Sequence, residues 1–187
     1  MSMNCPEIPV RFSATDPVSY SKGVTFGRRM MHNIASYLIR HLPGFEHAFI
    51  SREAAMLGAR ESWRIKGKHY LVEADYHNQS RFPDAVCRTA WFIDAHGEKV
   101  SEQLSKGGFY EIPYRSLVTN EIKNLLVTGR CISASFILQA SMRIQPTCMS
   151  IGEAAGIAAA WGLKHNIAAN EIAWDKIPAE KRSYVSN

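Results

Sequence analysis

The clearest hydrophobic pattern of the chain lies in residues 124–164. Residues 125–127 are apolar and stand between polar neighbours, which predicts a short buried strand. Gly129 follows, and glycine suits a sharp turn because it tolerates backbone angles closed to other residues. Pro146 suits the first turn of a helix, where its missing N–H costs no hydrogen bond. Small and apolar residues then recur at helical spacing: Cys148, Ile151, Ala155, Ala158 and Gly162.

A strand, a turn and a helix in this order create a place that suits an electron-rich or anionic group. The first N–H groups of a helix lack acceptors within it, and the helix dipole adds partial positive charge at the same end. A tight packing unit without any ligand is equally compatible with the pattern, because glycine signals alone are weak. The pattern by itself leaves both alternatives open.

Two longer elements are predicted before this region. Helical spacing of apolar residues over 27–41 predicts a long helix, capped by Ser19 or Ser21 and ended by Pro43. The apolar and aromatic residues of 86–93 predict a strand.

The predicted elements near the C-terminus begin with residues 110–117, a strand pair broken by Pro113. Asn170 is the expected cap of a last short helix that runs through Ile177. The final ten residues are polar, and we expect them to be frayed.

Residues 60–65 alternate loosely between polar and apolar side chains, so they form a candidate strand. In a strand, Arg60 and Arg64 lie on one face. Two guanidinium groups on one face can hold a carboxylate or phosphate through paired hydrogen bonds. A surface ladder of ion pairs with nearby glutamates is the alternative. Arg115 is a further candidate contact for an anion.

Composition narrows the class of protein. A length of 187 residues suits one domain, or one and a part, and 46% hydrophobic with 21% charged residues is typical of a folded core. The net charge of +5 is spread thinly and no nucleic-acid motif accompanies it, so we expect no nucleic-acid partner. We also expect no membrane span, because Glu153 interrupts the best apolar run, and the N-terminus lacks a signal-peptide core.

The four cysteines show no C-x-x-C spacing, which favours neither a zinc site nor a disulfide framework. We therefore predict no metal site and a cytoplasmic protein with reduced thiols. Cys148 has two interpretations. At a helix start its thiol pKa is lowered and the group is reactive if exposed, whereas a small cysteine facing the core is inert.

Several ordered motifs carry a resemblance to a known family. They are YEIPYRSL over residues 110–117, NLLVTGRCIS over 124–133 and SMRIQPTCMSIGEAAG over 141–156, with LGARESWRIKG over 57–67 and RFPDAV over 81–86 upstream. These motifs resemble the C-terminal part of FAD-dependent oxidoreductases. The group in question includes flavoproteins similar to fumarate reductase and to the flavin subunit of heterodisulfide reductase. The resemblance covers most of the chain.

The resemblance implies that this chain closes over FAD. In such proteins the turn after the last strand lies by the ribityl chain, and the start of the last long helix faces the pyrimidine edge of the flavin. The implied FAD contacts in this sequence are Gly129, Arg130, Arg143, Thr147, Cys148 and Met149. The resemblance places Arg60, Arg64 and Arg115 on the substrate side, where they would hold an anionic small molecule.

The implied fold class is α/β, or mixed α+β. It comprises part of an FAD-binding domain of the glutathione-reductase type and a small mixed sheet that faces the substrate. We expect residues 1–109 to form a substrate-facing cap region with one long helix. Residues 110–178 then form the C-terminal closure of the FAD-binding domain, and residues 179–187 a polar tail.

A dinucleotide-binding flavoprotein holds the pyrophosphate with a G-x-G-x-x-G turn after an early strand, and this sequence contains no such motif. We therefore expect the N-terminal Rossmann half to be missing and the chain to be the C-terminal part of a longer oxidoreductase. Alone, it is expected to be inactive and to bind FAD weakly or not at all. Its expected partner is the missing dinucleotide-binding segment or a partner subunit.

Two alternatives to this interpretation remain. The chain is a truncated remnant or partner-binding subunit that does not hold FAD, or it completes a flavin site together with another polypeptide. In each case part of its apolar cover is absent, so self-association is expected.

Overall fold

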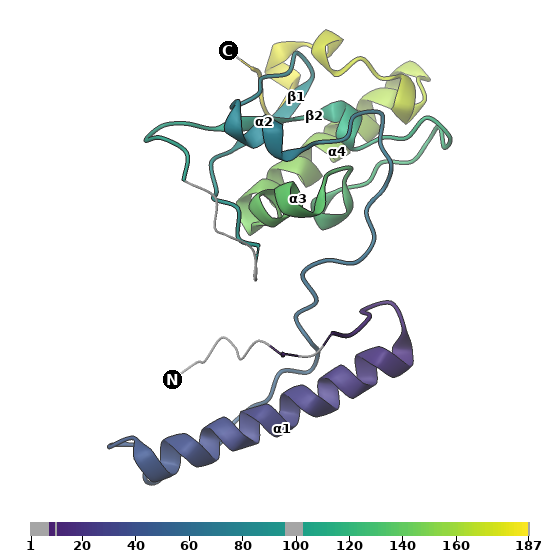
Figure 1. The fold of residues 1–187 in the computed structure, drawn as a ribbon. Helices are drawn as coiled ribbons and strands as arrows, with labels where there is room; N and C mark the ends of the chain where they lie inside the picture. Colours follow the sequence, from purple (N-terminus) through teal and green to yellow (C-terminus); the bar gives the residue numbers. More distant parts are fainter. Residues whose placement is uncertain (1–7, 10, 96–102, 187) are drawn as a thin grey trace. The chain divides into compact units, whose positions relative to one another are not determined.

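The structure, a computed structural model, describes residues 8–9, 11–95 and 103–186. The chain divides into two compact units, Met1–Ser62 and Trp63–Asn187. Helix α1 belongs to the first unit, and all other helices and strands belong to the second (Figure 1).

The first unit contains α1, Pro17–His41. The helix starts well before the predicted residue 27, and its N-cap is Asp16 rather than the predicted serines. The Asp16 carboxylate accepts hydrogen bonds from the amides of Val18 and Ser19 at 3.1 and 3.3 Å. The helix ends before Pro43, as the sequence predicts.

The second unit contains a two-stranded antiparallel sheet, with β1 at Ala85–Thr89 and β2 at Tyr110–Pro113. The first strand was predicted over 86–93 and is shorter than that run. Of the strand pair predicted over 110–117, only the part up to Pro113 is a strand, and Tyr114–Ser116 forms a 3₁₀ turn instead. The second strand ends at Pro113 because proline has no N–H to donate to a neighbouring strand. The two strands pair residues from both sides of position 109, where the sequence analysis divided the chain.

Within its described residues, the second unit has three α-helices. They are α2 at Glu73–His77, α3 at Phe136–Met142 and α4 at Gln145–His165. The long helix α4 confirms the sequence prediction and packs against β1. The α3 segment, interpreted from the sequence as a polar connection, is a helix because Ser135 caps it by accepting a hydrogen bond from the Leu138 amide at 3.1 Å.

Single 3₁₀ turns connect these elements. They are η1 (Tyr114–Ser116), η2 (Gly129–Cys131), η3 (Ala169–Glu171), η4 (Trp174–Lys176) and η5 (Ala179–Lys181). The predicted last α-helix is therefore two 3₁₀ turns, η3 and η4, and Asn170 lies inside the first of them rather than capping it.

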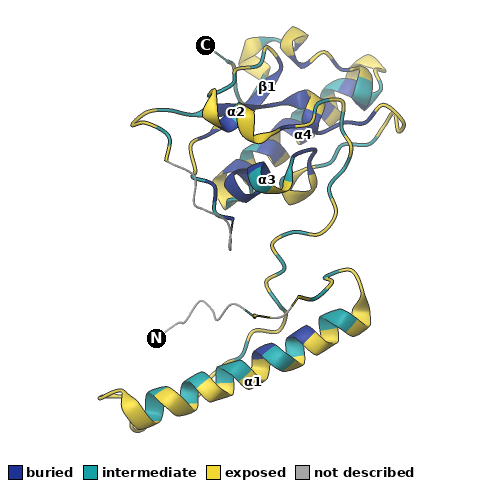
Figure 2. Cartoon of the chain, in the orientation of Figure 1, coloured by how far each residue is buried: buried dark blue, intermediate teal, exposed yellow. Residues whose placement is uncertain are grey.

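The core of the second unit lies between the sheet, α3 and α4, where Figure 2 shows the buried residues. Its largest members are aromatic, and each polar end has a partner. The Tyr110 hydroxyl donates to Ser141 Oγ at 2.8 Å, and the Tyr114 hydroxyl donates to the Ala169 carbonyl at 2.7 Å. The Trp174 indole N–H donates to a β1 carbonyl at 2.9 Å. These bonds remove the cost of burying polar atoms.

Two predicted strands are wrong. Residues 125–127 form no strand and are only half-buried, with one backbone hydrogen bond from the Val127 amide to the Leu117 carbonyl at 2.9 Å. Residues 60–65 also form no strand, so the argument that alternate residues share a face does not apply there. A strand requires a hydrogen-bonding neighbour, and within the described residues neither segment pairs with one in a sheet.

The C-terminal tail is not frayed, contrary to expectation. The Tyr184 hydroxyl donates to Glu111 Oε1 at 2.7 Å, and Ser186 Oγ lies 2.8 Å from the same oxygen. Glu111 lies on β2 and is fully buried, and its other oxygen accepts from the Phe82 amide at 2.8 Å. A buried carboxylate needs such donors, and the tail supplies two of them.

Candidate functional site

The candidate site is the junction of the η2 turn and the first turn of α4, which pack against each other. The turn brings Arg130 and Cys131 close enough to Cys148 to change the pKa of its thiol. The structure thus brings together Gly129, Arg130 and Cys148, which the sequence resemblance assigned to one site.

The first turn of α4 begins at Gln145, and Pro146 occupies its second position. The N-cap Ile144 offers no side-chain hydrogen bond. The Cys148 amide donates to the Ile144 carbonyl at 3.0 Å, so it is already used inside the helix. The amides of Gln145 and Thr147 are the first-turn N–H groups without an acceptor within the helix. Cys148 therefore has no free backbone N–H to offer a ligand.

The backbone at Gly129 has φ of +69°, a left-handed conformation that favours glycine. A Cβ atom built at this position would meet no heavy atom within 4 Å. Glycine is therefore favoured at this position by the left-handed backbone conformation and not by steric crowding around a Cβ atom. The open space beside it leaves room for another group to approach the backbone.

The Cys148 thiol is half-buried, and burial raises its pKa. The positive charge of Arg130 lowers the thiol pKa and Cys131 raises it, but the net direction is upward. The raised pKa favours the protonated, inert thiol over the reactive thiolate considered from the sequence.

The other predicted cofactor contacts differ in exposure. Thr147 is buried, and its hydroxyl forms a 3.1 Å hydrogen bond with the Thr89 hydroxyl, which ties α4 to β1. Met149 is 74% exposed. The Arg143 guanidinium, at the C-cap of α3, donates to the Asp94 carbonyl at 2.6 Å. Arg143 therefore contacts Asp94, whose Oδ2 also lies 3.5 Å from the same guanidinium nitrogen.

One side of α4 is bare. Its buried side consists of Thr147, Ile151, Ala154, Ala155, Ala158 and Gly162, and Figure 2 shows exposed residues along the rest of the helix. The exposed side carries Leu163, 86% exposed, and Met149. Gly152 and Gly156 lie between them, where a Cβ would meet nothing within 4 Å. A helix this rich in small residues offers room for close approach on that side.

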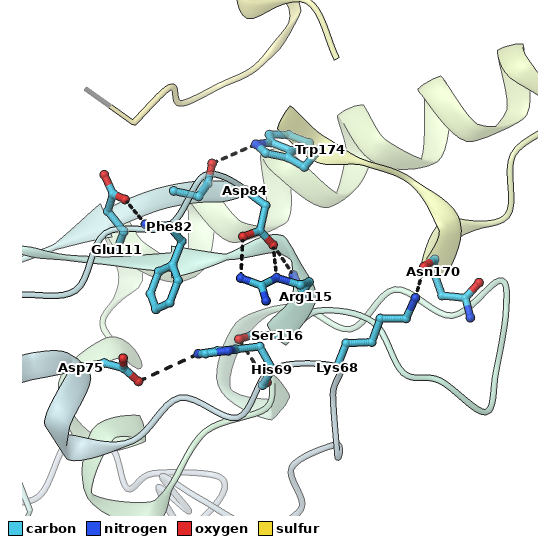
Figure 3. A network of polar contacts seen from close by, with 11 residues as sticks. Lys68, His69, Asp75, Phe82, Asp84, Glu111, Arg115, Ser116, Asn170 and Trp174 are labelled. Carbon is cyan, nitrogen blue, oxygen red and sulfur yellow. Dashed lines mark hydrogen bonds and ion pairs between the residues drawn. The ribbon is translucent and has the colours of Figure 1, made fainter. Parts of the chain in front are cut away.

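Arg115 is held by an acidic residue that the sequence analysis did not select. Its guanidinium donates to both carboxylate oxygens of Asp84, at 2.9 and 3.0 Å, as Figure 3 shows. Asp84 has an 11% exposed side chain, whereas that of Arg115 is 46% exposed. The ion pair raises the pKa of the Arg115 guanidinium. The RFPDAV motif contains Asp84 directly before β1, which is the signal that could have found it.

Arg60 and Arg64 belong to different units, because the division falls after Ser62. Arg60 is exposed and Arg64 is half-buried. The segment after Arg64 is hydrogen-bonded into the second unit, with the Ile65 amide donating to the Cys131 carbonyl at 2.9 Å. That bond attaches the Arg64 region to the η2 turn of the candidate site.

His69 lies beside the Asp84–Arg115 pair, with its ring 4.9 Å from that of Phe82 (Figure 3). Its Nε2 is buried without a hydrogen-bond partner among the described residues, and Asp75 Oδ2 lies 4.0 Å away. Burial lowers the pKa of His69, the Asp75 and Asp84 carboxylates oppose this, and Arg115 reinforces it. The imidazole is therefore neutral at physiological pH.

A protein-family model described as FAD dependent oxidoreductase matches residues 1–180. The chain belongs to this family. The membership confirms the resemblance inferred from the motifs. The helices and the small sheet of the structure are consistent with the α/β fold class predicted from the sequence. Comparisons with curated proteins and with solved structures give no match.

Membership of the FAD-dependent oxidoreductase family makes FAD the cofactor expected of its members. None of the helices in the described part of the chain has the length and hydropathy needed to cross a bilayer. The described residues also contain no group of three or more histidine, cysteine, aspartate or glutamate side chains placed to hold a metal ion.

Proposed function

We propose that this chain forms the C-terminal, flavin-facing part of an FAD-dependent oxidoreductase. The observation that carries the proposal is the packing of the Gly129–Arg130 turn against the first turn of α4. Family membership indicates FAD as the cofactor. The junction offers the first-turn amides of Gln145 and Thr147, and the space beside Gly129 is open. The donor set fits the ribityl and pyrimidine end of a flavin.

In this proposal each residue has a role that follows from its place. FAD, when bound, supplies hydride transfer, and the protein positions it and sets the local charge. The amide of Thr147 and the positive end of α4 favour negative charge at the pyrimidine edge. Arg130 adds a full positive charge at the turn, while Cys148 and Met149 contribute contact area. Arg143 stiffens the approach to α4 through its bond to Asp94.

The pyrophosphate of FAD must be held elsewhere in this proposal. A G-x-G-x-x-G turn is absent from the sequence, and the junction offers no replacement for it. A dinucleotide-binding segment or partner subunit would complete the site. The bare side of α4, with Met149 and Leu163 exposed, supports a missing neighbour or self-association. A remnant that holds no flavin is the competing proposal, as is a cytoplasmic subunit that binds only a partner.

The substrate in this proposal is a small anion held by arginines. Arg64 lies on the segment that is hydrogen-bonded to the η2 turn, and Arg115 presents a half-exposed guanidinium. The pair with Asp84 uses two donors of Arg115 and leaves Nη1 for a ligand. Arg60 is included because the resemblance assigns it.

Titration of the chain with FAD, FMN and riboflavin tests the proposal, with flavin fluorescence anisotropy as the measurement. The junction contacts only parts that all three flavins share, so we expect weak binding of similar strength for all three. Arg130→Gln should weaken it, whereas Lys176→Gln, a distant and exposed charge change, should not. Stoichiometric FAD that survives dialysis would show a pyrophosphate site within this chain. Binding of no flavin at millimolar concentration favours the remnant.

A further inference from the structure

A hollow in the second unit lies at the end of β1, away from the η2 turn in sequence. It has a volume of about 560 Å³ and is lined by Arg88, Thr89, Leu104, Lys106, Gly108 and Phe109. This volume is in the range of small-molecule sites, which run from about 300 to 1,000 Å³. The hollow combines two cationic side chains with an apolar wall made by Leu104 and Phe109.

Neither cation of the hollow has an ion-pair partner among the described residues. Arg88 and Lys106 are both exposed, and no described carboxylate lies within ion-pair distance of either. Glu111 is the cross-strand register partner of Arg88 in the β1–β2 pairing. Its carboxylate already accepts from Phe82, Tyr184 and Ser186. Positive charge in the hollow is therefore only partly balanced.

The wall of the hollow is held in place by a third cation. The Arg81 guanidinium carbon lies 3.6 Å from the centre of the Phe109 ring and that of Arg88 lies 4.9 Å from it. Arg81 also donates to the carbonyls of Gln79 and Phe109. A Cβ at Gly108 would lie 2.8 Å from Gln79 Oε1, so the loop is closely packed at this point. The aromatic wall is thus held in place, with the guanidinium of Arg88 beside it.

We propose that this hollow binds a small organic anion, with its phosphate or carboxylate group on Arg88 and Lys106 and its apolar body against Phe109. The planar guanidinium fork of Arg88 suits two parallel hydrogen bonds to such a group, and Lys106 adds a point charge. The hollow and its wall carry three described cationic side chains and one described carboxylate: Arg81, Arg88 and Lys106, and Glu111. The hollow shares no residue with the η2–α4 junction, and its lining residue Thr89 is hydrogen-bonded to Thr147 of that junction.

The test uses phenyl phosphate as the probe and amide NMR spectra of the chain as the measurement. We expect saturable shifts of the Gly107 and Gly108 amides, which neighbour Lys106. Lys106→Gln and Arg88→Gln should each weaken binding about three- to tenfold, the range for a charge-assisted contact near solvent. Arg88→Lys keeps the charge but loses the fork, so it should fall between Arg88→Gln and the parent.

Lys123→Gln is the matched control, because Lys123 is exposed and the same charge is removed elsewhere in the unit. Equal weakening by this control would mean general attraction to a basic protein and would overturn the proposal. So would binding of neutral benzyl alcohol as tight as that of phenyl phosphate, or the absence of shifts at Gly107 and Gly108. Inorganic phosphate and benzoate distinguish the two anion types. The same spectra show whether each variant is folded.

Discussion

The Asp84–Arg115 ion pair gives the sharpest stability prediction. Its two side-chain hydrogen bonds are 2.9 and 3.0 Å long, and Asp84 Oδ2 also accepts from the Arg115 amide at 3.1 Å. Exposed pairs are worth about 0.2–1 kcal/mol, whereas breaking a buried pair costs about 3–5 kcal/mol. One partner here is 11% exposed and the other 46%. We therefore expect a coupling energy of about 2 kcal/mol, between these limits.

A double-mutant cycle with Asp84→Asn and Arg115→Gln isolates this coupling energy. Arg115→Gln should destabilise the unit most, because it leaves the nearly buried Asp84 carboxylate with the backbone amide of residue 115 as its described donor. A coupling of about 2 kcal/mol changes the folding equilibrium about 30-fold. With a urea m-value of about 1–3 kcal/mol/M, the denaturation midpoint shifts by about 1 M.

Tryptophan fluorescence in urea is the right assay, because all four tryptophans lie in the second unit. Trp174 is fully buried and bonds to the carbonyl of Ala85, the residue after Asp84, so it reports unfolding at this place. The Asp175–Lys176 contact, at 3.4 Å, has an 80% exposed lysine and serves as the control cycle, with a coupling below about 0.5 kcal/mol expected. An Asp84–Arg115 coupling as small as that of the control would refute the reasoning.

Three further predictions concern packing, pH and the tail. Gly162→Ala should destabilise the unit by about 1–3 kcal/mol, because the new Cβ would lie 2.7 Å from the Ile167 carbonyl oxygen. Gly156→Ala, on the bare side, should instead stabilise α4 by about 0.5–1 kcal/mol. Equal urea midpoints for the two variants would contradict this pair of predictions. Because the pKa of His69 is lowered by folding, the imidazole takes up a proton in the unfolded state at a higher pH than in the folded state. The free energy of unfolding should therefore fall between pH 7 and pH 5, and it should fall less in His69→Gln. Equal losses in the parent and in His69→Gln would exclude this role of His69. Tyr184→Phe should cost about 1 kcal/mol by removing a donor to the buried Glu111 carboxylate, and an unchanged urea midpoint would show that the tail contributes nothing.

The sequence alone determined the elements whose signals are local. The spacing of small and apolar residues predicted α4, and Pro43 correctly marked the end of α1. The ordered motifs indicated the family before any coordinates, and the family model confirms it. Some of their residues suit a particular backbone conformation. Gly129, with its positive φ, is one such residue.

Tertiary structure alone decided which apolar runs became strands and which charges found partners. Residues 125–127 carry the hydrophobicity of a strand but lack a pairing neighbour, whereas 85–89 gain one from 110–113. Arg115 pairs with Asp84, which is 31 residues away in the chain, and Glu111 receives its donors from Tyr184 and Ser186. Hydrogen-bond and ion-pair partners this distant follow from the packing of the whole unit. Local periodicity and composition carry no information about them.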